Sequence, residues 1–302
     1  MPLKIIKESD PITVETIVLT IYAPPGVGKT SLAFSADAPL LLDTDQGAYR
    51  SAFRKDAAEA KSWEDIAGIT AADVAGYKTL VLDTAGRALD LLSTDIIAGN
   101  PKMGRGGALT LQGYGELKTR FAAYLKLMRS VGLDIVLVAH SEEKSQGDEL
   151  IERIDMQGSS KQEVYKSSDA MARLAIRGGA RVLTFSPTDT QFGKDPAGIG
   201  AVGIPDLAAE PAFLGGIIRQ IKDTLNALTA EQAEAMKAAQ ERAIAWGEHL
   251  DAAETPEHYT DLIGKAQDAN EKRQLHEAAT EAGYTFDKKA KAYQGATEEA
   301  AA

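Results

Sequence analysis

Short apolar runs rich in β-branched residues recur through the first two-thirds of the chain. Runs of this length and composition predict buried strands. Between the early runs, apolar residues recur at helical spacing, most clearly over residues 116–131, where Leu117, Phe121, Leu125 and Met128 share one face. The alternation of strands and helices predicts an α/β fold with a mainly parallel sheet flanked by helices. The predicted strands are residues 16–22, 39–43, 79–83, 134–139, 171–176 and 181–186.

The last two predicted strands are separated only by Arg177-Gly178-Gly179-Ala180. This connection is too short for a crossover helix, so it predicts an antiparallel hairpin that extends the sheet. Downstream, a Pro- and Gly-rich connection leads into a helical pattern over residues 217–250. Residues 254–293 predict two or three short helices, beginning at the N-cap signal Thr255-Pro256-Glu257. We therefore expect an α/β core over residues 1–204, a helical connection over 205–253, and a small α-helical module with a disordered tail over 254–302.

The composition excludes several classes of protein. The 302 residues include no cysteine, which excludes a disulfide framework and a thiolate metal site and fits a reducing compartment. The N-terminal residues lack the long apolar run of a signal peptide, and no run of about 18 apolar residues occurs. We therefore expect a cytoplasmic protein with no transmembrane helix.

The net charge of −11 is unevenly distributed. Residues 205–302 hold 18 Asp and Glu against 10 Lys and Arg, whereas residues 1–204 hold 26 against 23. This balance argues against strong nonspecific binding to nucleic acid. Any nucleic-acid site must be a local basic or Gly-rich surface on the N-terminal part.

A predicted strand, a Gly-containing turn and the start of a helix follow one another in TIVLTIYAPPGVGKTSLAF. The P-loop pattern G-x-x-x-x-G-K-[ST] matches at Gly28, Lys29 and Thr30, with Ala23 in place of the first glycine. Glycines let backbone N–H groups surround a β-phosphate, the lysine reaches the β- and γ-phosphates, and the threonine hydroxyl binds Mg²⁺. The pattern predicts an ATP·Mg site, with nucleotide contacts at Pro25, Gly26, Val27, Gly28, Lys29, Thr30 and Ser31.

Three further predicted strands end in polar residues. Residues 79–83 end in Asp83, which would orient a Mg²⁺-bound water or cap the next turn. The strand before it ends in Asp43 and is followed by Asp45; either carboxylate could polarise the attacking water, or both could cap the loop. Residues 134–139 are followed by His140, which could sense the γ-phosphate by hydrogen bonding or be structural. The predicted catalytic set is Lys29, Asp45, Asp83 and His140, with Thr30 and Asp83 at the metal.

With these strand ends in order, residues 15–200 resemble the RecA-type ATPase core, and more closely the phage-encoded RecA-like recombination ATPases of the Sak group. The stretches LLLDTDQGAYR, TLVLDTAGRALD and LVAHSEE carry the resemblance, together with GRGGALTLQGYGELK and FSPTDTQFGKDP. The resemblance implies that Asp45 occupies the position of the catalytic glutamate, one methylene shorter. It also implies that His140 occupies the position of the polar sensor that couples nucleotide state to DNA loops, and that the protein acts in the cytoplasm of a phage-infected or prophage-carrying bacterium.

Two long polar stretches, residues 99–115 and 145–166, lie where the resemblance implies DNA-binding loops. The first is net positive and Gly-rich and has a tyrosine that could stack on a base, whereas the second is only slightly positive near its end. Both could also be ordinary surface loops. The candidate DNA-binding residues are Lys102, Arg105, Tyr114, Arg153, Lys161 and Lys166.

RecA-type cores complete the ATP site with a cation from a neighbouring subunit, so the resemblance implies a homo-oligomer, either a ring or a filament. The candidates for that cation are Arg177, Arg181 and Lys194, and each could equally be a solvated charge. The expected function is a single-stranded-DNA-binding recombination ATPase working beside an annealing or single-strand-binding protein. The alternatives are a nucleotide-gated adaptor or a helicase-loader-like P-loop protein that acts mainly on protein partners.

Overall fold

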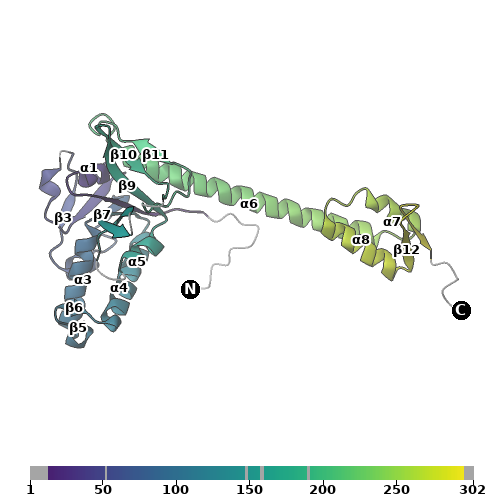
Figure 1. Cartoon of the computed structure of the whole chain (residues 1–302), viewed down its shortest axis with the longest axis horizontal. Coiled ribbons are helices and arrows are strands. Elements are labelled where there is room, and N and C mark those ends of the chain that lie inside the picture. The colour runs from purple at the N-terminus through teal and green to yellow at the C-terminus, as the bar shows by residue number, and fades with distance from the viewer. Residues whose placement is uncertain (1–12, 52, 147–148, 157–159, 189–190, 296–302) are drawn as a thin grey trace. The chain divides into compact units, whose positions relative to one another are not determined.

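The computed structural model describes residues 13–51, 53–146, 149–156, 160–188 and 191–295 (Figure 1). The chain divides into two compact units, and the boundary between residues 228 and 229 falls inside helix α6 (Phe213–Asp251). The larger unit contains the central sheet, and the smaller unit contains the C-terminal helices. The predicted disordered tail, residues 296–302, lies outside the described residues.

The larger unit is built on a sheet with the strand order β11-β10-β9-β1-β7-β4-β2-β3. In the part of this order that runs β9-β1-β7-β4-β2-β3, every pair of neighbouring strands is parallel, which confirms the predicted α/β fold. Strands β2 and β4 coincide with the predicted runs, and β1 and β9 differ from them by one or two residues. The parallel strands are β1 (Val18–Ala23), β2 (Pro39–Asp43), β3 (Ala57–Glu59), β4 (Thr79–Asp83), β7 (Asp134–Gln146) and β9 (Ala170–Arg177).

The strand register brings the polar strand ends to one edge of the sheet. Asp43 pairs with Asp83 across β2 and β4, and Ala23, which precedes the P-loop, pairs with His140 across β1 and β7. Parallel strands present their carboxyl ends at the same edge, where open α/β sheets bind ligands. Parallel pairing alone therefore assembles the predicted site.

The sheet ends in an antiparallel extension, as predicted. Strand β10 (Ala180–Thr184) pairs with β9, and β11 (Ala201–Gly203) pairs with β10. The turn between β9 and β10 uses Gly178 and Gly179 at φ values of 57° and 82°, the left-handed backbone that a tight hairpin needs at both central positions. The strands at the two ends of this order, β3 and β11, have three residues each.

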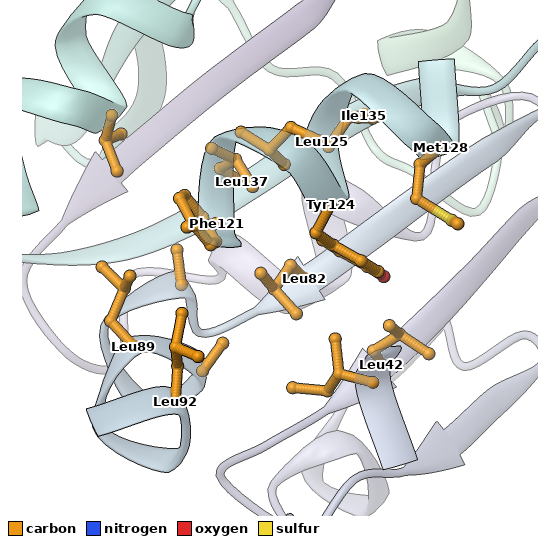
Figure 2. Packing of buried hydrophobic residues seen from close by; sticks show 14 of the residues in the cluster. Leu42, Leu82, Leu89, Leu92, Phe121, Tyr124, Leu125, Met128, Ile135 and Leu137 are labelled. Atoms are coloured by element: carbon orange, nitrogen blue, oxygen red, sulfur yellow. The ribbon is translucent and has the colours of Figure 1, made fainter. Parts of the chain in front are cut away.

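Helices cover both faces of the sheet. On one face, helices α3 (Ala85–Gly99) and α4 (Leu111–Ser130) pack over β2, β4 and β7 (Figure 2). The predicted face of α4 does point inward, and Phe121 is fully buried among Leu82, Leu89 and Leu137 in this cluster. On the other face, α1 (Lys29–Ala33) and the start of α6 pack against β1 and β9.

We expect Phe121→Ala to lower the free energy of unfolding of the larger unit by about 3–5 kcal/mol, because it leaves a cavity in a closely packed core. Urea unfolding followed by circular dichroism measures this change. The matched control is Leu127→Ala on the same helix, whose side chain is 51 % exposed and whose loss should cost less than about 0.5 kcal/mol. Equal costs for the two variants would contradict this description of the core.

The prediction of a loop over residues 99–115 was wrong. The segment holds a short 3₁₀ helix, η2 (Pro101–Met103), a small hairpin of β5 (Gly104–Arg105) and β6 (Ala108–Leu109), and the first turn of α4. Gly113 misled the prediction, because a Cβ there would lie 2.5 Å from the Met103 carbonyl oxygen. This glycine allows a close backbone approach inside a helix rather than marking a loop. We call residues 100–110, which lie at the far end of α3 and α4 (Figure 1), the α3–α4 tip.

The prediction of a loop over residues 145–166 was also wrong. Strand β7 continues to Gln146 and pairs with β8 (Glu149–Ile154), and α5 (Ser160–Ser167) follows. Ile151, Ile154 and Val164 are buried, so the segment has an apolar side that its many charges conceal in the sequence. Residues 147–148 and 157–159 of the predicted DNA loop lie outside the described residues.

The smaller unit holds α7 (Pro256–Ile263), α8 (Ala269–Glu281) and a hairpin of β12 (Tyr284–Asp287) and β13 (Ala292–Gly295). The N-cap signal is confirmed, since Thr255 accepts a hydrogen bond from the His258 N–H. The hairpin stands where a third helix was possible, so the module is not purely helical. Its core includes Tyr259 and Tyr293, as expected for aromatic residues of a small module. Over the described part of the chain, no helix is long and apolar enough to cross a membrane.

Candidate nucleotide site

The P-loop connects the end of β1 to the start of α1. Gly26 and Gly28 have φ values of 79° and 101°, which side chains disfavour, so both positions require glycine. Ala23 is the last residue of β1 and has ordinary strand backbone, which explains why the first glycine of the pattern is dispensable here. Val27 turns its side chain into the hydrophobic core, whereas Pro25 and its glycine neighbours line the pocket.

Lys29 is held at the centre of the site. Its Nζ donates hydrogen bonds of 2.9 Å to the carbonyl oxygens of Ala23 and of Pro24, and lies 3.3 Å from His140 Nδ1. Burial lowers the pKa of Lys29, while the nearby carboxylates of Asp83 and Asp45 oppose that shift. A phosphate group beside this ammonium would supply the missing negative charge.

Thr30 and Asp83 lie in direct contact, as the P-loop chemistry requires. Thr30 Oγ1 donates a 2.6 Å hydrogen bond to Asp83 Oδ2, and burial raises the pKa of Asp83. Hard oxygen atoms of this kind suit Mg²⁺, which keeps several waters and takes its remaining ligands from phosphates. Thr30 would bind the ion directly, and Asp83 would accept a hydrogen bond from one of its waters. Among the described residues no cluster of three or more His, Asp or Glu side chains forms a separate metal site.

The two carboxylates after β2 have different roles. Asp43 is buried and accepts hydrogen bonds from the backbone N–H groups of Gly47, at 3.0 Å, and Ala48, at 2.8 Å, so it caps its own loop. Asp45 instead faces the pocket, where its carboxylate lies 3.3 Å from Arg87 Nε. Both carboxylates line the pocket, but Asp43 is occupied by the backbone of its own loop, so Asp45 is the better placed of the two to contact reacting groups.

His140 bridges Asp45 and Lys29. Its Nε2 lies 3.5 Å from Asp45 Oδ2, and its Nδ1 faces the Lys29 ammonium. Because an ammonium group can only donate, Nδ1 is the acceptor and Nε2 carries the proton that faces Asp45. The hydrogen bond from His140 holds the pKa of Asp45 below its ordinary value, and Arg87 and Thr84 contribute in the same direction. Asp45 is therefore ionised at neutral pH.

The nucleotide pocket has a volume of about 300 Å³, and a second cavity of about 510 Å³ adjoins it. The two share Asp45, Arg50, Thr84 and His140 in their linings. The sequence did not single out Arg50 or Arg87. Arg50 is exposed beside the P-loop, and Arg87 forms ion pairs with Asp45 and, at 3.5 Å, with Asp90. Their positions in the sequence could have identified them as site residues, because Arg50 follows Asp45 closely and Arg87 follows the end of β4 closely.

The three candidates for a trans-acting cation differ in their surroundings. Lys194 donates to the backbone carbonyl oxygens of Tyr165 and Ser168, so it is used inside its own chain. Arg181 contacts its own P-loop, with Nε donating a 2.8 Å hydrogen bond to the Val27 carbonyl oxygen. Within the described part of the chain, Arg177 has no hydrogen-bond or ion-pair partner, and it is exposed at the β9–β10 turn.

The candidate DNA-binding residues fall in two parts of the chain, residues 102–114 and residues 153–166. Lys102 and Arg105 are exposed on the α3–α4 tip, whereas Tyr114 is partly buried against the core and is poorly placed to stack on a base. On the β7–β8 side, Lys161 pairs with Glu142 at 3.2 Å and Arg153 lies over the Phe192 ring. Lys166 is exposed on α5. Lys102, Arg105 and Lys166 are therefore the exposed cations of this set, whereas Tyr114, Arg153 and Lys161 contact other parts of the chain.

Comparison with protein families decides the class of the larger unit. Residues 15–197, more than half of the chain, match the family model described as an AAA domain. The chain belongs to this AAA family. An AAA domain is a P-loop ATPase, which agrees with the geometry of Lys29, Thr30 and Asp83 and implies nucleotide binding and hydrolysis, usually with Mg²⁺. No match was found among curated proteins.

Proposed function

We propose that this AAA domain is an ATP-dependent single-stranded-DNA-binding ATPase of the Sak recombination type. The observation that carries the proposal is the continuity of β7. This strand holds His140 at the nucleotide and then runs without a break into the β7–β8 hairpin, defined as β8 with the part of β7 that pairs with it. One continuous strand thus connects the nucleotide pocket to a surface outside it.

The chain that leaves the hairpin after β8 also contacts His140. The N–H of Asp155, which follows β8, donates a 2.9 Å hydrogen bond to the His140 carbonyl oxygen. A shift of His140 when ATP is exchanged for ADP would therefore move both ends of the hairpin. A hairpin that takes one position with ATP and another with ADP would couple the nucleotide to a second ligand.

The DNA-binding surface in this proposal comprises the α3–α4 tip and the β7–β8 side. Lys102 and Arg105 supply exposed positive charge at the tip, and Gly106 and Gly107 let the backbone come close to phosphates. Lys166 adds an exposed cation on α5. The Lys161–Glu142 ion pair would have to open for Lys161 to contribute.

A homo-oligomer would complete the ATPase site. Arg177 is the best placed of the three cations to act in a neighbouring subunit, because it is exposed at a turn at the carboxyl edge of the sheet. The acidic smaller unit would contact a protein partner, such as an annealing or single-strand-binding protein, rather than DNA. Cytoplasmic action in a phage-carrying bacterium belongs to the same proposal.

Measuring ATP turnover with and without single-stranded DNA, over a range of protein concentrations, tests this function. We expect stimulation by the DNA and a specific activity that rises with protein concentration. Turnover that is the same with and without DNA at every protein concentration would contradict the DNA-binding proposal. It would not contradict the assignment of the nucleotide site. A strand-displacement assay on duplex DNA separates this function from that of a helicase-like motor.

We expect the double variant Lys102→Ala/Arg105→Ala to bind single-stranded DNA more weakly. The slope of log affinity against log salt should fall by about 1.4, because two phosphate contacts are lost. Fluorescence anisotropy of a labelled oligonucleotide at several salt concentrations measures this slope. Lys126→Ala, which removes an exposed lysine from the outer side of α4, is the matched control. An unchanged slope in the double variant would remove the α3–α4 tip from the DNA surface.

One observation favours a second candidate, a nucleotide-gated adaptor that hydrolyses ATP slowly. Asp45 is shorter than glutamate and is engaged by Arg87 and His140, which would restrain it from activating water. Such an adaptor, or a helicase-loader-like protein, would act on protein partners. It would show nucleotide-dependent binding to a partner protein and turnover that DNA does not change.

A further inference from the structure

Arg181 contacts the P-loop and is not among the residues that line the nucleotide pocket. It lies on β10, and its Nε donates a 2.8 Å hydrogen bond to the Val27 carbonyl oxygen. The residues that line the pocket include Gly26, Gly28 and Lys29 but not Arg181. Arg181 is therefore placed to act on the loop rather than on the nucleotide.

The contact determines how one peptide unit of the P-loop is oriented. In a trans peptide the C=O of one residue and the N–H of the next point in opposite directions. Holding the Val27 carbonyl toward Arg181 therefore turns the Gly28 N–H away from Arg181. N–H groups at this position of a P-loop surround the β-phosphate.

The arginine also packs directly on Gly28. A Cβ at that glycine would lie 3.2 Å from Arg181 Nε and 3.7 Å from its Cζ, so the guanidinium covers the space that a side chain would occupy. Gly28 has the left-handed φ of 101° and would otherwise be free to adopt several conformations. Arg181 thus restricts Gly28, a P-loop residue that has no side chain of its own to limit its backbone.

We propose that Arg181 is a positioning residue that pre-orients the Gly28 N–H for the β-phosphate by holding the Val27 carbonyl. The antiparallel β9–β10 extension thereby becomes part of the nucleotide-binding apparatus of the same chain. In this proposal Arg181 acts on the P-loop of its own chain. The inference rests on nucleotide binding by the P-loop and does not require the proposed DNA binding.

Two substitutions separate the hydrogen bond from the charge. In Arg181→Gln, the amide nitrogen stands the same number of bonds from Cα as Arg Nε, so it retains a donor for Val27 and loses the charge. Arg181→Met has similar length and neither donor nor charge, and Arg181→Leu is a second donor-free variant should the methionine variant be unstable. Thermal unfolding checks that each variant is folded. Isothermal titration with ADP and Mg²⁺, without DNA, measures the affinity.

We expect the methionine variant to bind ADP about tenfold more weakly than wild type, the effect of one lost orienting hydrogen bond. The glutamine variant should stay within about twofold of wild type, and kcat at saturating ATP should change little in either. Equal weakening by glutamine and methionine would show that the charge matters and would overturn the proposal, as would wild-type affinity in both. A wild-type protein that binds no ADP would instead overturn the nucleotide site itself.

Discussion

Replacing Lys29 by alanine is expected to lower ATP turnover by at least about a hundredfold. The buried Lys29 ammonium lies beside the anion nest of the P-loop and within 3.3 Å of His140. It is the cation of this chain that would offset the charge developing on the β- and γ-phosphates, and removing one such group from a preorganised site costs about 10²–10³ in kcat. A coupled assay for released phosphate measures the loss.

Lys126→Ala again provides the control, since it removes a lysine of the same length from an exposed helical position and should leave turnover unchanged. Thermal unfolding of the Lys29 variant should show a folded protein, because burying the ammonium is itself unfavourable and its loss relieves that cost. Turnover that survives in Lys29→Ala would mean that the observed activity comes from another site or from a contaminant.

The second large effect is expected for Asp45→Asn. The substitution keeps the volume of the side chain and removes its ability to accept a proton from water. We expect kcat to fall by about 10²–10⁴, while the affinity for ATP changes little, because Asp45 faces the pocket without binding the P-loop. Steady-state kinetics separate the two parameters, and unchanged turnover would eliminate Asp45 as the base.

The pH dependence provides an independent check. The hydrogen bond from His140 lowers the pKa of Asp45, so the carboxylate is ionised above its folded pKa and becomes protonated only as the pH falls through that value. In the wild-type protein, protonation of Asp45 should therefore not limit kcat at any pH above about 4, the ordinary range for aspartate. Asp90→Asn, at the wall of the adjoining cavity, is the matched control and should retain turnover.

Much of the sheet and of the phosphate site could be predicted from short-range patterns. Buried parallel strands are nearly continuous apolar runs, so β2 and β4 were found at their observed bounds. The P-loop motif couples residue identity to local backbone geometry, and Gly28 has the positive φ that the motif requires. Parallel topology then explains why residues far apart in the sequence, such as Asp45 and His140, meet at one edge.

Other features depend on packing that the sequence pattern does not encode. Gly113 resembles a loop residue until its contact with the Met103 carbonyl is known. The ion pair of Asp45 with Arg87 and the hydrogen bond of Arg181 to Val27 both depend on the tertiary structure. A charged residue on a helix or hairpin is usually solvated, so composition alone could not distinguish these arginines from their exposed neighbours.

The short edges of the central sheet restrict how copies of the chain can assemble. Strands β3 and β11 each offer only three residues of backbone to a neighbour, too few for a stable intermolecular ladder. Continuation of the sheet from one subunit to the next through β3 or β11 is therefore disfavoured. A ring or filament joined at these two ends of the sheet would rely on side-chain surfaces, which can separate and re-form as the nucleotide changes without breaking a β-ladder.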